Sequence, residues 1–477
     1  MKPINLALTL LLITAELMVI GRALLRPHRE PMSRLAWIIV IIIVPIVGML
    51  AYLLLGEARV SVSRWRRGKE IDAELKRPPT DPAAVKKVRA SNYAAALALA
   101  STVNRLAPTR GNSATLAADS NVAIDEMCAD IDRAADTAHA SFYIWLDDNN
   151  GLKVKDAFLR AARRGVAVRV LADAVGSRSL IQSRHWRDLA EGGVEARIAL
   201  PVGNPLIRMV RGRLDVRNHR KLLILDNRIA WCGSQNTADP EFRIKPRYAP
   251  WVDVMTRWDG PVARDFQLLF IEDWMAEGGE SLGELLTAPV PARTGSIVAQ
   301  VLGTGPTLRF DAMPTTFATL IHSAREELVV TTPYFVPDEQ IIYALTSAAR
   351  RGVRTILALP KRCDSRVVQA VARSYYRDLL EAGVEIMEYR CGLLHAKTMI
   401  VDGAAGLIGS ANLDRRSFEL NFEDNLLFID ADFAKVIRRR QEEYLADCDP
   451  VTMDQVTGFT LPRRLLQNLL ATLSPVL

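Results

Sequence analysis

Cysteine is scarce in this sequence. Five cysteines are scattered over 477 residues, without a Cys-x-x-C pair. An odd, dispersed set argues against a disulfide framework, and the lack of paired spacing argues against a structural zinc site. The sequence therefore predicts no bound metal and no cofactor, and a chain of this length is expected to form two or more folded units.

Aromatic and acidic residues are also in short supply. Aromatic residues make up 6% of the chain and do not interleave with basic residues in an extended stacking pattern, which argues against nucleic acid as a partner. Lys and Arg number 61 against 54 Asp and Glu, a net charge of +7. A mild positive excess indicates an anionic partner and by itself fits a lipid surface or a nucleic acid.

Two stretches lack charge almost entirely. Residues 4–20 form a nearly unbroken apolar run interrupted by Glu16, and residues 35–55 are uncharged but contain Pro45. About 20 apolar residues can cross about 30 Å of hydrocarbon, and proline is tolerated in membrane helices. No small-x-small cleavage pattern follows the first stretch, so residues 1–56 are predicted to form a transmembrane helix hairpin rather than a signal peptide.

Basic residues flank both predicted spans. The loop between them carries four arginines, and the flank after the second span carries four arginines and a lysine. In a hairpin, Lys2 lies on the same side of the membrane as this second flank. The positive-inside rule therefore favours, by a narrow count, an integral membrane protein whose main body is cytoplasmic.

One polar motif occurs twice. Each copy reads His-x-Lys-x4-Asp, followed at one spacing by Gly-Ser-x-Asn. Each is predicted to be a strand, a turn at the Asp and a second strand, and side chains two apart on a strand point to the same face. The residues are His219, Lys221, Asp226 and Asn236 in the first copy, and His395, Lys397, Asp402 and Asn412 in the second.

The duplicated motif predicts an anion site. A single copy could be a hairpin with a core histidine, but two copies with all polar residues in step make that reading improbable. An imidazole, an ammonium group and an amide that converge twice suit the phosphate of a diester. Asp226 and Asp402, at the turns, are expected to brace the loops rather than contact substrate.

The segments around the motifs repeat as well. Residues 161–166 match 348–353, and residues 187–195 match 377–385. Alternating strand and helix patterns with short turns predict an α/β fold of two similar lobes with one shared site. The predicted units are a connector at 57–119, a first lobe at 120–274, a linker at 275–295, a second lobe at 296–448 and an amphipathic segment at 449–477.

The motif pair resembles the phospholipase D superfamily. Residues 412–423 and 332–338, together with the apolar start, resemble the bacterial cardiolipin synthases within it. The resemblance implies that His219 is the nucleophile and that His395 is the acid and base. It also implies that Asp226 and Asp402 count with the two His-Lys pairs among the catalytic residues. The implied substrate is phosphatidylglycerol in an anionic bacterial inner membrane. Spacing alone is symmetric between the two histidines.

Two histidines with opposed roles fit diester chemistry, since one must attack as a neutral ring and the other must supply a proton. Lys221 and Lys397 would hold the phosphate oxygens, with Asn236 and Asn412 as further donors. Asp253 and Glu423 follow the histidines of their own repeats by 34 and 28 residues and are candidates to orient them. Asp424, the next residue after Glu423, is an alternative candidate for orienting the histidine.

Two further segments carry hypotheses. The first repeat has about 14 extra residues before its histidine, including Arg208, Arg211 and Arg213, which read either as an interfacial lid or as a solvated loop. The apolar spacing after residue 460 suits an interfacial helix or a docking helix.

The predicted activity is transfer of a phosphatidyl group between two phosphatidylglycerol molecules, giving cardiolipin and glycerol. A phospholipase D-type hydrolase would use the same residues, and a nuclease would use the same diester chemistry. The apolar spans argue against the nuclease, and the two intact motifs argue against an inactive scaffold.

Overall fold

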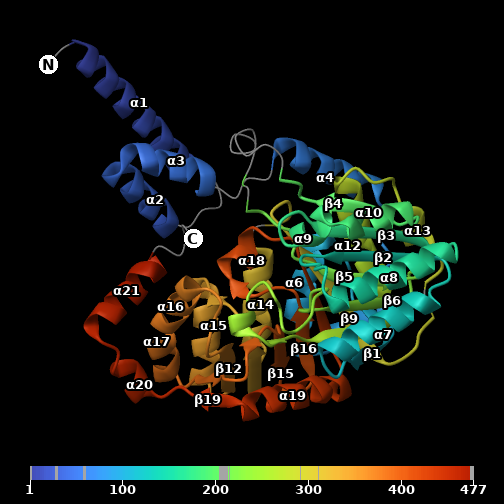
Figure 1. Cartoon of the computed structure of the whole chain (residues 1–477). Coiled ribbons are helices and arrows are strands. Elements are labelled where there is room, and N and C mark those ends of the chain that lie inside the picture. The colour runs from blue at the N-terminus through green and yellow to red at the C-terminus, as the bar shows by residue number, and fades with distance from the viewer. Residues whose placement is uncertain are drawn as a thin grey trace.

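The computed structural model describes residues 3–26, 31–56, 61–202, 213, 215–290, 292–309 and 311–472. The main body holds two similar halves, each a set of strands covered by helices (Figure 1). The first half comprises β1 Thr109–Leu116, α7 Ser120–Arg133, β2 Thr137–Phe142, α8 Asn149–Arg163, β3 Ala167–Asp173, α9 Arg178–Gln182, α10 Arg184–Glu191, β4 Glu195–Ala199, β5 Lys221–Leu225, β6 Ile229–Gly233, a 3-10 turn Pro246–Tyr248, β7 Trp251–Val252, β8 Met255–Asp259 and α12 Val262–Ala276, and α13 Glu284–Thr287 follows it.

The second half repeats the main helices and strands of the first, with further short elements and a C-terminal extension. Its elements are β9 Ile297–Thr304, α14 Ala312–His322, β10 Glu327–Thr331, β11 Phe335–Val336, α15 Glu339–Arg350, β12 Arg354–Pro360, α16 Arg366–Ser374, α17 Tyr376–Glu381, β13 Glu385–Tyr389, β14 Leu393–Leu394, β15 Thr398–Val401, β16 Ala405–Gly409, β17 Leu413–Asp414, α18 Arg415–Glu419, β18 Glu423–Ile429 and α19 Ala431–Ala446, and then β19 Cys448–Pro450, α20 Met453–Thr457 and α21 Leu461–Thr472.

One continuous 15-stranded sheet joins the halves, in the order β19-β13-β12-β10-β15-β16-β18-β9-β1-β8-β6-β5-β2-β3-β4. Apart from β19, the order is the same read from either end, with the antiparallel pair β9–β1 at its centre. In each half three strands run parallel and the rest antiparallel. The prediction of an α/β fold with two similar lobes is confirmed.

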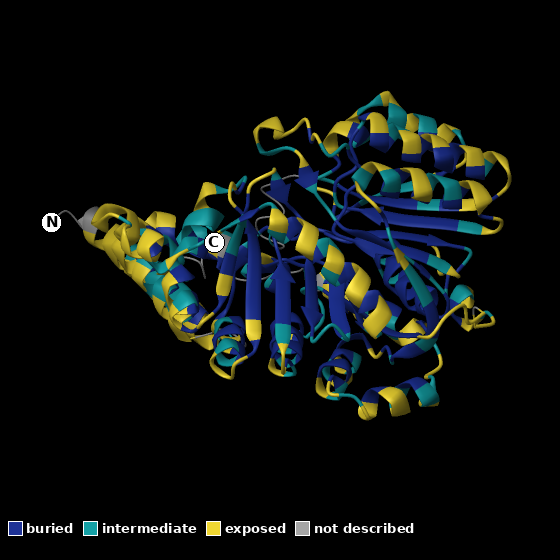
Figure 2. Ribbon diagram, turned by 90° about the horizontal axis from the view of Figure 1, so that it is seen from below, coloured by how far each residue is buried: buried dark blue, intermediate teal, exposed yellow. Residues whose placement is uncertain are grey.

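The sheet buries both faces, so its strands are apolar on both sides. Leu223 and Leu225 of β5 join a cluster with α7 and α8, whereas Leu222 and Ile224 join a cluster with α12. This alternation places the helices in layers on opposite faces of the sheet. The strands form the buried interior and the helices present their exposed residues outward (Figure 2). The cluster around α12 also contains residues of α19, so it belongs to both lobes.

Residues 57–119, predicted as a connector, contribute helices and a strand to the main body. Helices α4 Val62–Glu74, α5 Pro82–Arg89 and α6 Ala94–Asn104 pack on the body, and Ala96 and Ala100 of α6 lie in the core of the second lobe. Strand β1 lies inside the sheet, where it pairs with β8 and β9. Since β1 lacks an alternating apolar pattern, it gave no strand signal on its own.

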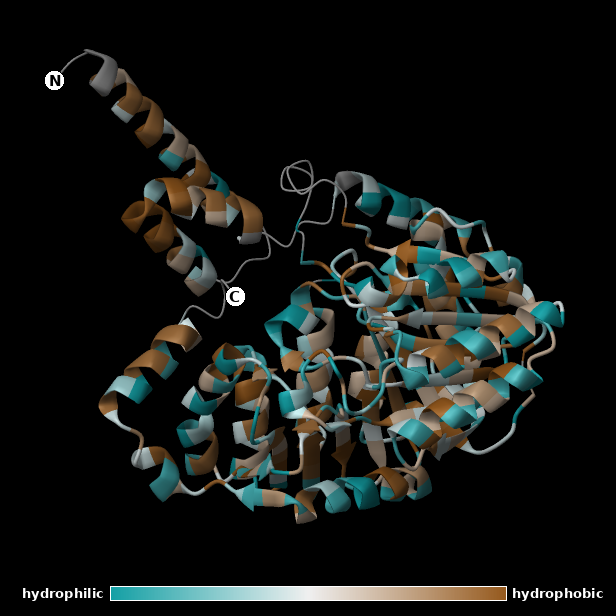
Figure 3. Cartoon of the chain, viewed as in Figure 1, coloured by the Kyte–Doolittle hydropathy of each residue, from teal (hydrophilic) through white to brown (hydrophobic). Residues whose placement is uncertain are grey.

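The N-terminal region contains three helices, α1 Pro3–Leu25, α2 Pro31–Ile43 and α3 Pro45–Leu55. They project from the body, and their apolar surfaces are apparent in Figure 3. Among the described residues, only the helix at Leu6–Leu25 is long and apolar enough to cross a membrane, and 6% of its most apolar window is buried.

The second predicted span is not one helix. It breaks at Val44, whose backbone is non-helical, and Pro45 begins the next helix. Proline has no N–H to bond the preceding turn, and its ring clashes with the carbonyl four residues back, so it is most stable at a helix start. The two resulting helices of 13 and 11 residues are each shorter than the span that the sequence predicted.

Candidate active site

Both His-x-Lys motifs lie at one edge of the sheet. Lys221 is the first residue of β5 and pairs with Phe142, the last residue of β2. In the second copy, Thr398 follows Lys397 directly. It is the first residue of β15 and pairs with Thr331, the last residue of β10. Each motif therefore lies at the carboxyl ends of the parallel strands of its own lobe. This edge is where α/β sheets characteristically place their ligands.

Short backbone pairings connect the two lobes at this edge. Strand β14, just before His395, pairs with β7, just before Asp253, and the His395 N–H donates to Val252 at 2.8 Å. In the symmetric position the His219 N–H donates to the Phe422 carbonyl at 2.9 Å. These pairings place His395 beside Asp253 and His219 beside Glu423, because each carboxylate directly follows the residue that accepts the histidine N–H.

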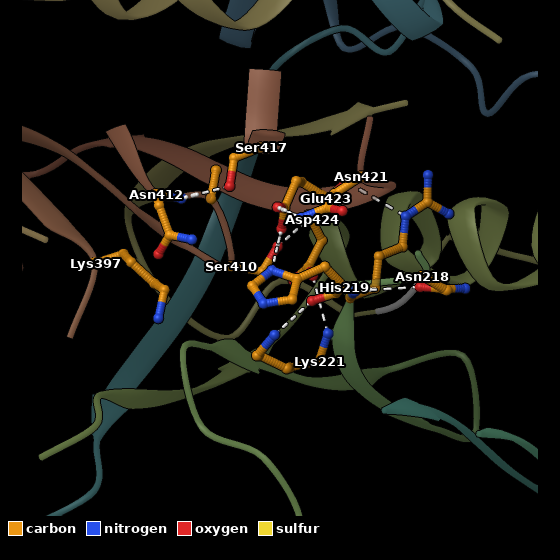
Figure 4. Close-up of polar contacts among 12 residues, drawn as sticks. Asn218, His219, Lys221, Lys397, Ser410, Asn412, Ser417, Asn421, Glu423 and Asp424 are labelled. Carbon is orange, nitrogen blue, oxygen red and sulfur yellow. Dashed lines mark hydrogen bonds and ion pairs between the residues drawn. The ribbon is translucent and has the colours of Figure 1, made fainter. Parts of the chain in front are cut away.

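The two imidazoles are held by carboxylates from opposite lobes. His219 Nδ1 lies 2.8 Å from Glu423 Oε2, and His395 Nδ1 lies 2.5 Å from Asp253 Oδ1. The Glu423 contact is drawn in Figure 4. The sequence offsets had suggested pairing within a repeat, and the structure corrects this to pairing between repeats. Of the two neighbouring acids, Glu423 makes the contact, while Asp424 accepts the Lys221 backbone N–H at 3.0 Å.

Two serines of the Gly-Ser-x-Asn motifs hold these carboxylates. Ser234 Oγ donates to Asp253 at 2.6 Å, and Ser410 Oγ donates to Glu423 at 2.5 Å. Each serine thus fixes the carboxylate that orients the histidine of the other lobe. The sequence analysis assigned no role to these serines, although their equal spacing in both repeats was the available signal.

The two lysines differ in their contacts. Lys221 Nζ donates to the His219 carbonyl at 2.5 Å, and Lys397 Nζ donates to the His395 carbonyl at 2.7 Å. Lys397 Nζ also lies 2.9 Å from His395 Nε2, so these two groups are close enough to share a proton. The repeats are symmetric in sequence, but this contact distinguishes His395 from His219.

Burial sets the charge of the histidines and lysines. It lowers the pKa of His219 and of His395 to about 4, even though the adjacent carboxylates oppose the shift. Burial likewise lowers the pKa of Lys221 to about 8 and that of Lys397 well below its ordinary value. Near neutral pH both imidazoles are therefore neutral, and Lys221 remains charged.

Ionised carboxylates accompany the neutral rings. Burial alone would raise the pKa of Asp253, but His395, Lys397 and Ser234 together lower it below its ordinary value. His219, Lys221 and Ser410 do the same for the pKa of Glu423. Both carboxylates can then accept Nδ1–H, which leaves the lone pair of each ring at Nε2.

We expect the pH profile of kcat/KM to be bell-shaped. It should rise through about pH 4, as the His219 ring loses its proton, and fall through about pH 8, as Lys221 loses its charge. Lys221→Arg should move the alkaline limb upward, since a guanidinium stays charged. Initial rates from about pH 3 to 10 test this, and a flat wild-type profile between pH 7 and 10 would contradict it.

One cavity of about 710 Å³ receives both histidines. Asn236 and Asn412 line it as well, and its remaining wall includes Val175, Ile244, Val336, Val367, Val368 and Val371. The Ile144 N–H donates to Asn236 Oδ1 at 3.1 Å, and the buried Oδ1 of Asn412 has no protein partner among the described residues. The cavity therefore combines a polar floor with an apolar wall, a combination suited to a phospholipid headgroup and its chains.

Two aromatic rings that the sequence analysis missed cover the histidines. Tyr143 lies 4.9 Å from the His219 ring and Trp251 lies 4.6 Å from the His395 ring, measured between centroids. They restrict ring rotation and exclude water from one side of each imidazole. Arg208 and Arg211 of the proposed lid lie outside the described residues, and Arg213 forms an ion pair with Asp215 at 2.6 Å.

The carboxylates of Asp226 and Asp402 hold the loops that follow their motif strands. The Asp226 carboxylate accepts backbone N–H groups from Ala135, Asp136 and Thr137 at 2.8–2.9 Å. Asp402 accepts the equivalent N–H groups of residues 325–327 at 2.8–3.1 Å. Each aspartate ties the turn after a motif strand to the start of the neighbouring parallel strand.

Asp226→Ala should destabilise the protein without removing a group from the cavity. Three backbone donors would lose a charged acceptor, and alanine tolerates the positive φ of 50° poorly, so we expect a loss of about 2–4 kcal/mol. Asp226→Asn is the control, because asparagine tolerates this backbone and keeps one acceptor oxygen. Thermal unfolding measures the loss, and a tenfold fall in kcat at unchanged stability would show that Asp226 acts in the chemistry instead.

Comparison with known proteins agrees with this geometry. Residues 127–247 and 317–445 match the family described as "Cardiolipin synthase, PLD-like domain", and residues 17–57 match "Phospholipase_D-nuclease N-terminal". The chain is 33% identical to cardiolipin synthase A of Edwardsiella ictaluri and 34% identical to that of Erwinia tasmaniensis, with 95% of each chain covered.

A solved structure supports the fold. Phosphatidylserine synthase of Haemophilus influenzae aligns with a TM-score of 0.58 at 14% identity, covering 80% of this chain and 97% of that one. The duplicated lobes, the paired histidines and the near full-length relatives all indicate the same family. The chain belongs to the cardiolipin synthase family of phospholipase D-like proteins.

Proposed function

We propose that this protein is a membrane cardiolipin synthase that transfers a phosphatidyl group from one phosphatidylglycerol to a second. The observation that carries the proposal is one cavity reached by two histidines, each oriented by a carboxylate of the other lobe, in a chain of this family. The family makes the protein a phosphatidyltransferase acting on phospholipids.

In the first step, Nε2 of neutral His219 attacks phosphorus. The P–O bond to the headgroup glycerol breaks, and His395 gives its proton to the departing oxygen. Phosphatidyl-histidine and free glycerol result. In the second step, His395 takes the proton from a headgroup hydroxyl of another phosphatidylglycerol. That oxygen attacks phosphorus, the P–N bond breaks, and cardiolipin forms with both histidines restored.

The Lys397 contact supports this division of roles. The lowered pKa leaves His395 neutral near pH 7, so it needs a proton before it can act as an acid. Lys397 Nζ lies 2.9 Å from its Nε2, and the lowered pKa of Lys397 favours proton transfer to the imidazole. A bound phosphodiester anion would stabilise the imidazolium further. Among the described residues, Lys221 Nζ bonds the His219 carbonyl and not the His219 ring, which suits a ring that must attack unprotonated.

Lys221, Lys397, Asn236 and Asn412 are proposed to hold the phosphate oxygens as charge develops on them. The apolar part of the cavity wall favours the lipid alcohol over water in the second step, because acyl chains pack there and water does not. A more open cavity would favour hydrolysis to phosphatidic acid by the same residues.

Helix α1 anchors the protein in the bacterial inner membrane in this proposal, and residues 35–55 complete a second crossing with a break at Pro45. Breaks of this kind are tolerated where neighbouring helices or water satisfy the freed backbone groups. The narrow excess of basic residues after residue 56 supports a cytoplasmic location for the lobes.

Mass spectrometry of the products tests the function. Purified protein in vesicles with phosphatidylglycerol as the only lipid should yield cardiolipin and glycerol in equal amounts. His219→Ala in the same vesicles is the matched control and should yield neither. Phosphatidic acid as the main lipid product would instead identify a hydrolase. Adding isotopically labelled phosphatidylethanolamine to the vesicles then shows whether a second headgroup competes as acceptor.

A further inference from the structure

The C-terminal helix α21 carries an apolar surface that the body leaves open. Its side chains Leu461, Leu465, Leu466 and Leu469 are 55–66% exposed. At 100° per residue these positions fall on one side of the helix. Leucines exposed by more than half and gathered in one stripe are uncommon on soluble surfaces and mark a site of contact with another protein or a membrane. We call these four residues the leucine stripe.

The opposite side of α21 is fixed to the body. The helix packs against α16, and Gln467 is buried in that contact. At the first turn the Arg463 guanidinium stacks on the Phe459 ring, 3.6 Å from its centroid. Phe459 itself packs against the core of the second lobe. The stripe is therefore held facing outward by a docked helix.

The same helix α16 forms part of the wall of the active-site cavity. Val367, Val368 and Val371 of α16 line the cavity, and Val367 is 39% exposed. Helix α16 therefore contacts α21, which carries the leucine stripe, and also lines the cavity. This arrangement is expected if lipid enters the cavity along α16.

Charge and position identify the occupant. Helix α21 contains Arg463 and Arg464 and no acidic residue. An apolar stripe flanked by arginines suits the boundary between the acyl chains and the anionic headgroups of a bilayer. Helix α21 also lies on the same side of the molecule as α1–α3 (Figures 1 and 3). A membrane crossed by α1 is then within reach of the stripe.

We infer that α21 lies in the surface of the anionic bilayer through the leucine stripe and seats the cavity on it, so that phospholipid moves from the membrane along α16 to the histidines. This inference rests on the proposed function for its kinetic consequence only. The membrane contact itself is independent of which reaction the protein catalyses.

The kinetic test uses the full chain in phosphatidylcholine vesicles. Phosphatidylglycerol is supplied either as a dilute long-chain lipid within the bilayer or as a soluble short-chain form in the water. The triple variant Leu461→Ser, Leu465→Ser, Leu469→Ser should lose on the order of tenfold in rate with the bilayer substrate, since burying each leucine contributes to seating. It should keep the wild-type rate with the soluble substrate. Val436→Ser on α19, 43% exposed, is the matched control.

A spectroscopic test does not depend on activity. Leu466→Cys is labelled with a fluorophore in a background where the exposed Cys391 is replaced by serine. Nitroxide lipids in the vesicles should quench this label more strongly than a label at position 436. The inference is overturned if the label is not quenched, or if the triple variant loses equal activity on both substrates. Wild-type protein inactive on both substrates would count against the proposed function and leave the quenching result standing.

Discussion

His219→Ala is expected to reduce turnover by at least about 10⁴-fold and to leave no phosphatidyl adduct, because loss of a nucleophile removes the covalent route altogether. His395→Ala is expected to be as slow in the full reaction, for a different reason. It lacks the proton donor of the first step and the base of the second, but its nucleophile is intact.

A substrate with a good leaving group separates the two histidines. Phosphatidyl-p-nitrophenol releases nitrophenolate without needing a proton, so His395→Ala should release one equivalent per site as a burst and then stall with an adduct on His219. His219→Ala should give no burst. His185→Ala is the control, since His185 contacts Lys155 and Asp188 outside the cavity. A burst in His219→Ala with an adduct on His395 would reverse the proposed roles.

Much of the fold could be predicted because the sequence contains an internal repeat. The repeated segments and the alternating strand and helix patterns specify two α/β lobes, and period-two spacing places each histidine and lysine together. Strand β1 escaped prediction because its residues lack an apolar alternation, and its place is fixed only by pairing with β8 and β9. Tertiary pairing outweighs local propensity at such positions.

The crossed pairing of carboxylates and histidines could not be predicted for a related reason. Sequence offsets describe one lobe at a time, whereas the pairing of β14 with β7 exists only after the lobes dock. The serine bonds the carboxylate of its own repeat, as Ser410 bonds Glu423. The histidine that this carboxylate orients belongs to the other repeat. The site is therefore incomplete in either lobe alone.

This crossing has a kinetic consequence that distinguishes Glu423 from Asp253. Glu423→Gln should slow the nitrophenolate burst by on the order of 10³–10⁴-fold, the effect of losing a carboxylate that fixes an imidazole tautomer. A glutamine amide can donate to Nδ1 instead of accepting from it. The His219 proton then sits on Nε2 and removes the lone pair that attacks phosphorus.

Asp253→Asn should leave the burst with nitrophenyl substrate close to wild type and slow the turnover that follows it, because Asp253 orients the ring that deprotonates the second alcohol. Asp424→Asn is the matched control, since that carboxylate accepts a backbone N–H rather than an imidazole proton, and its effect should stay within about tenfold. Stopped-flow burst rates and steady-state rates, measured on the same three variants, give both quantities. If carboxylates acted within their own repeats, Asp253→Asn would slow the burst and Glu423→Gln would spare it, and that exchange of phenotypes would refute the crossed assignment.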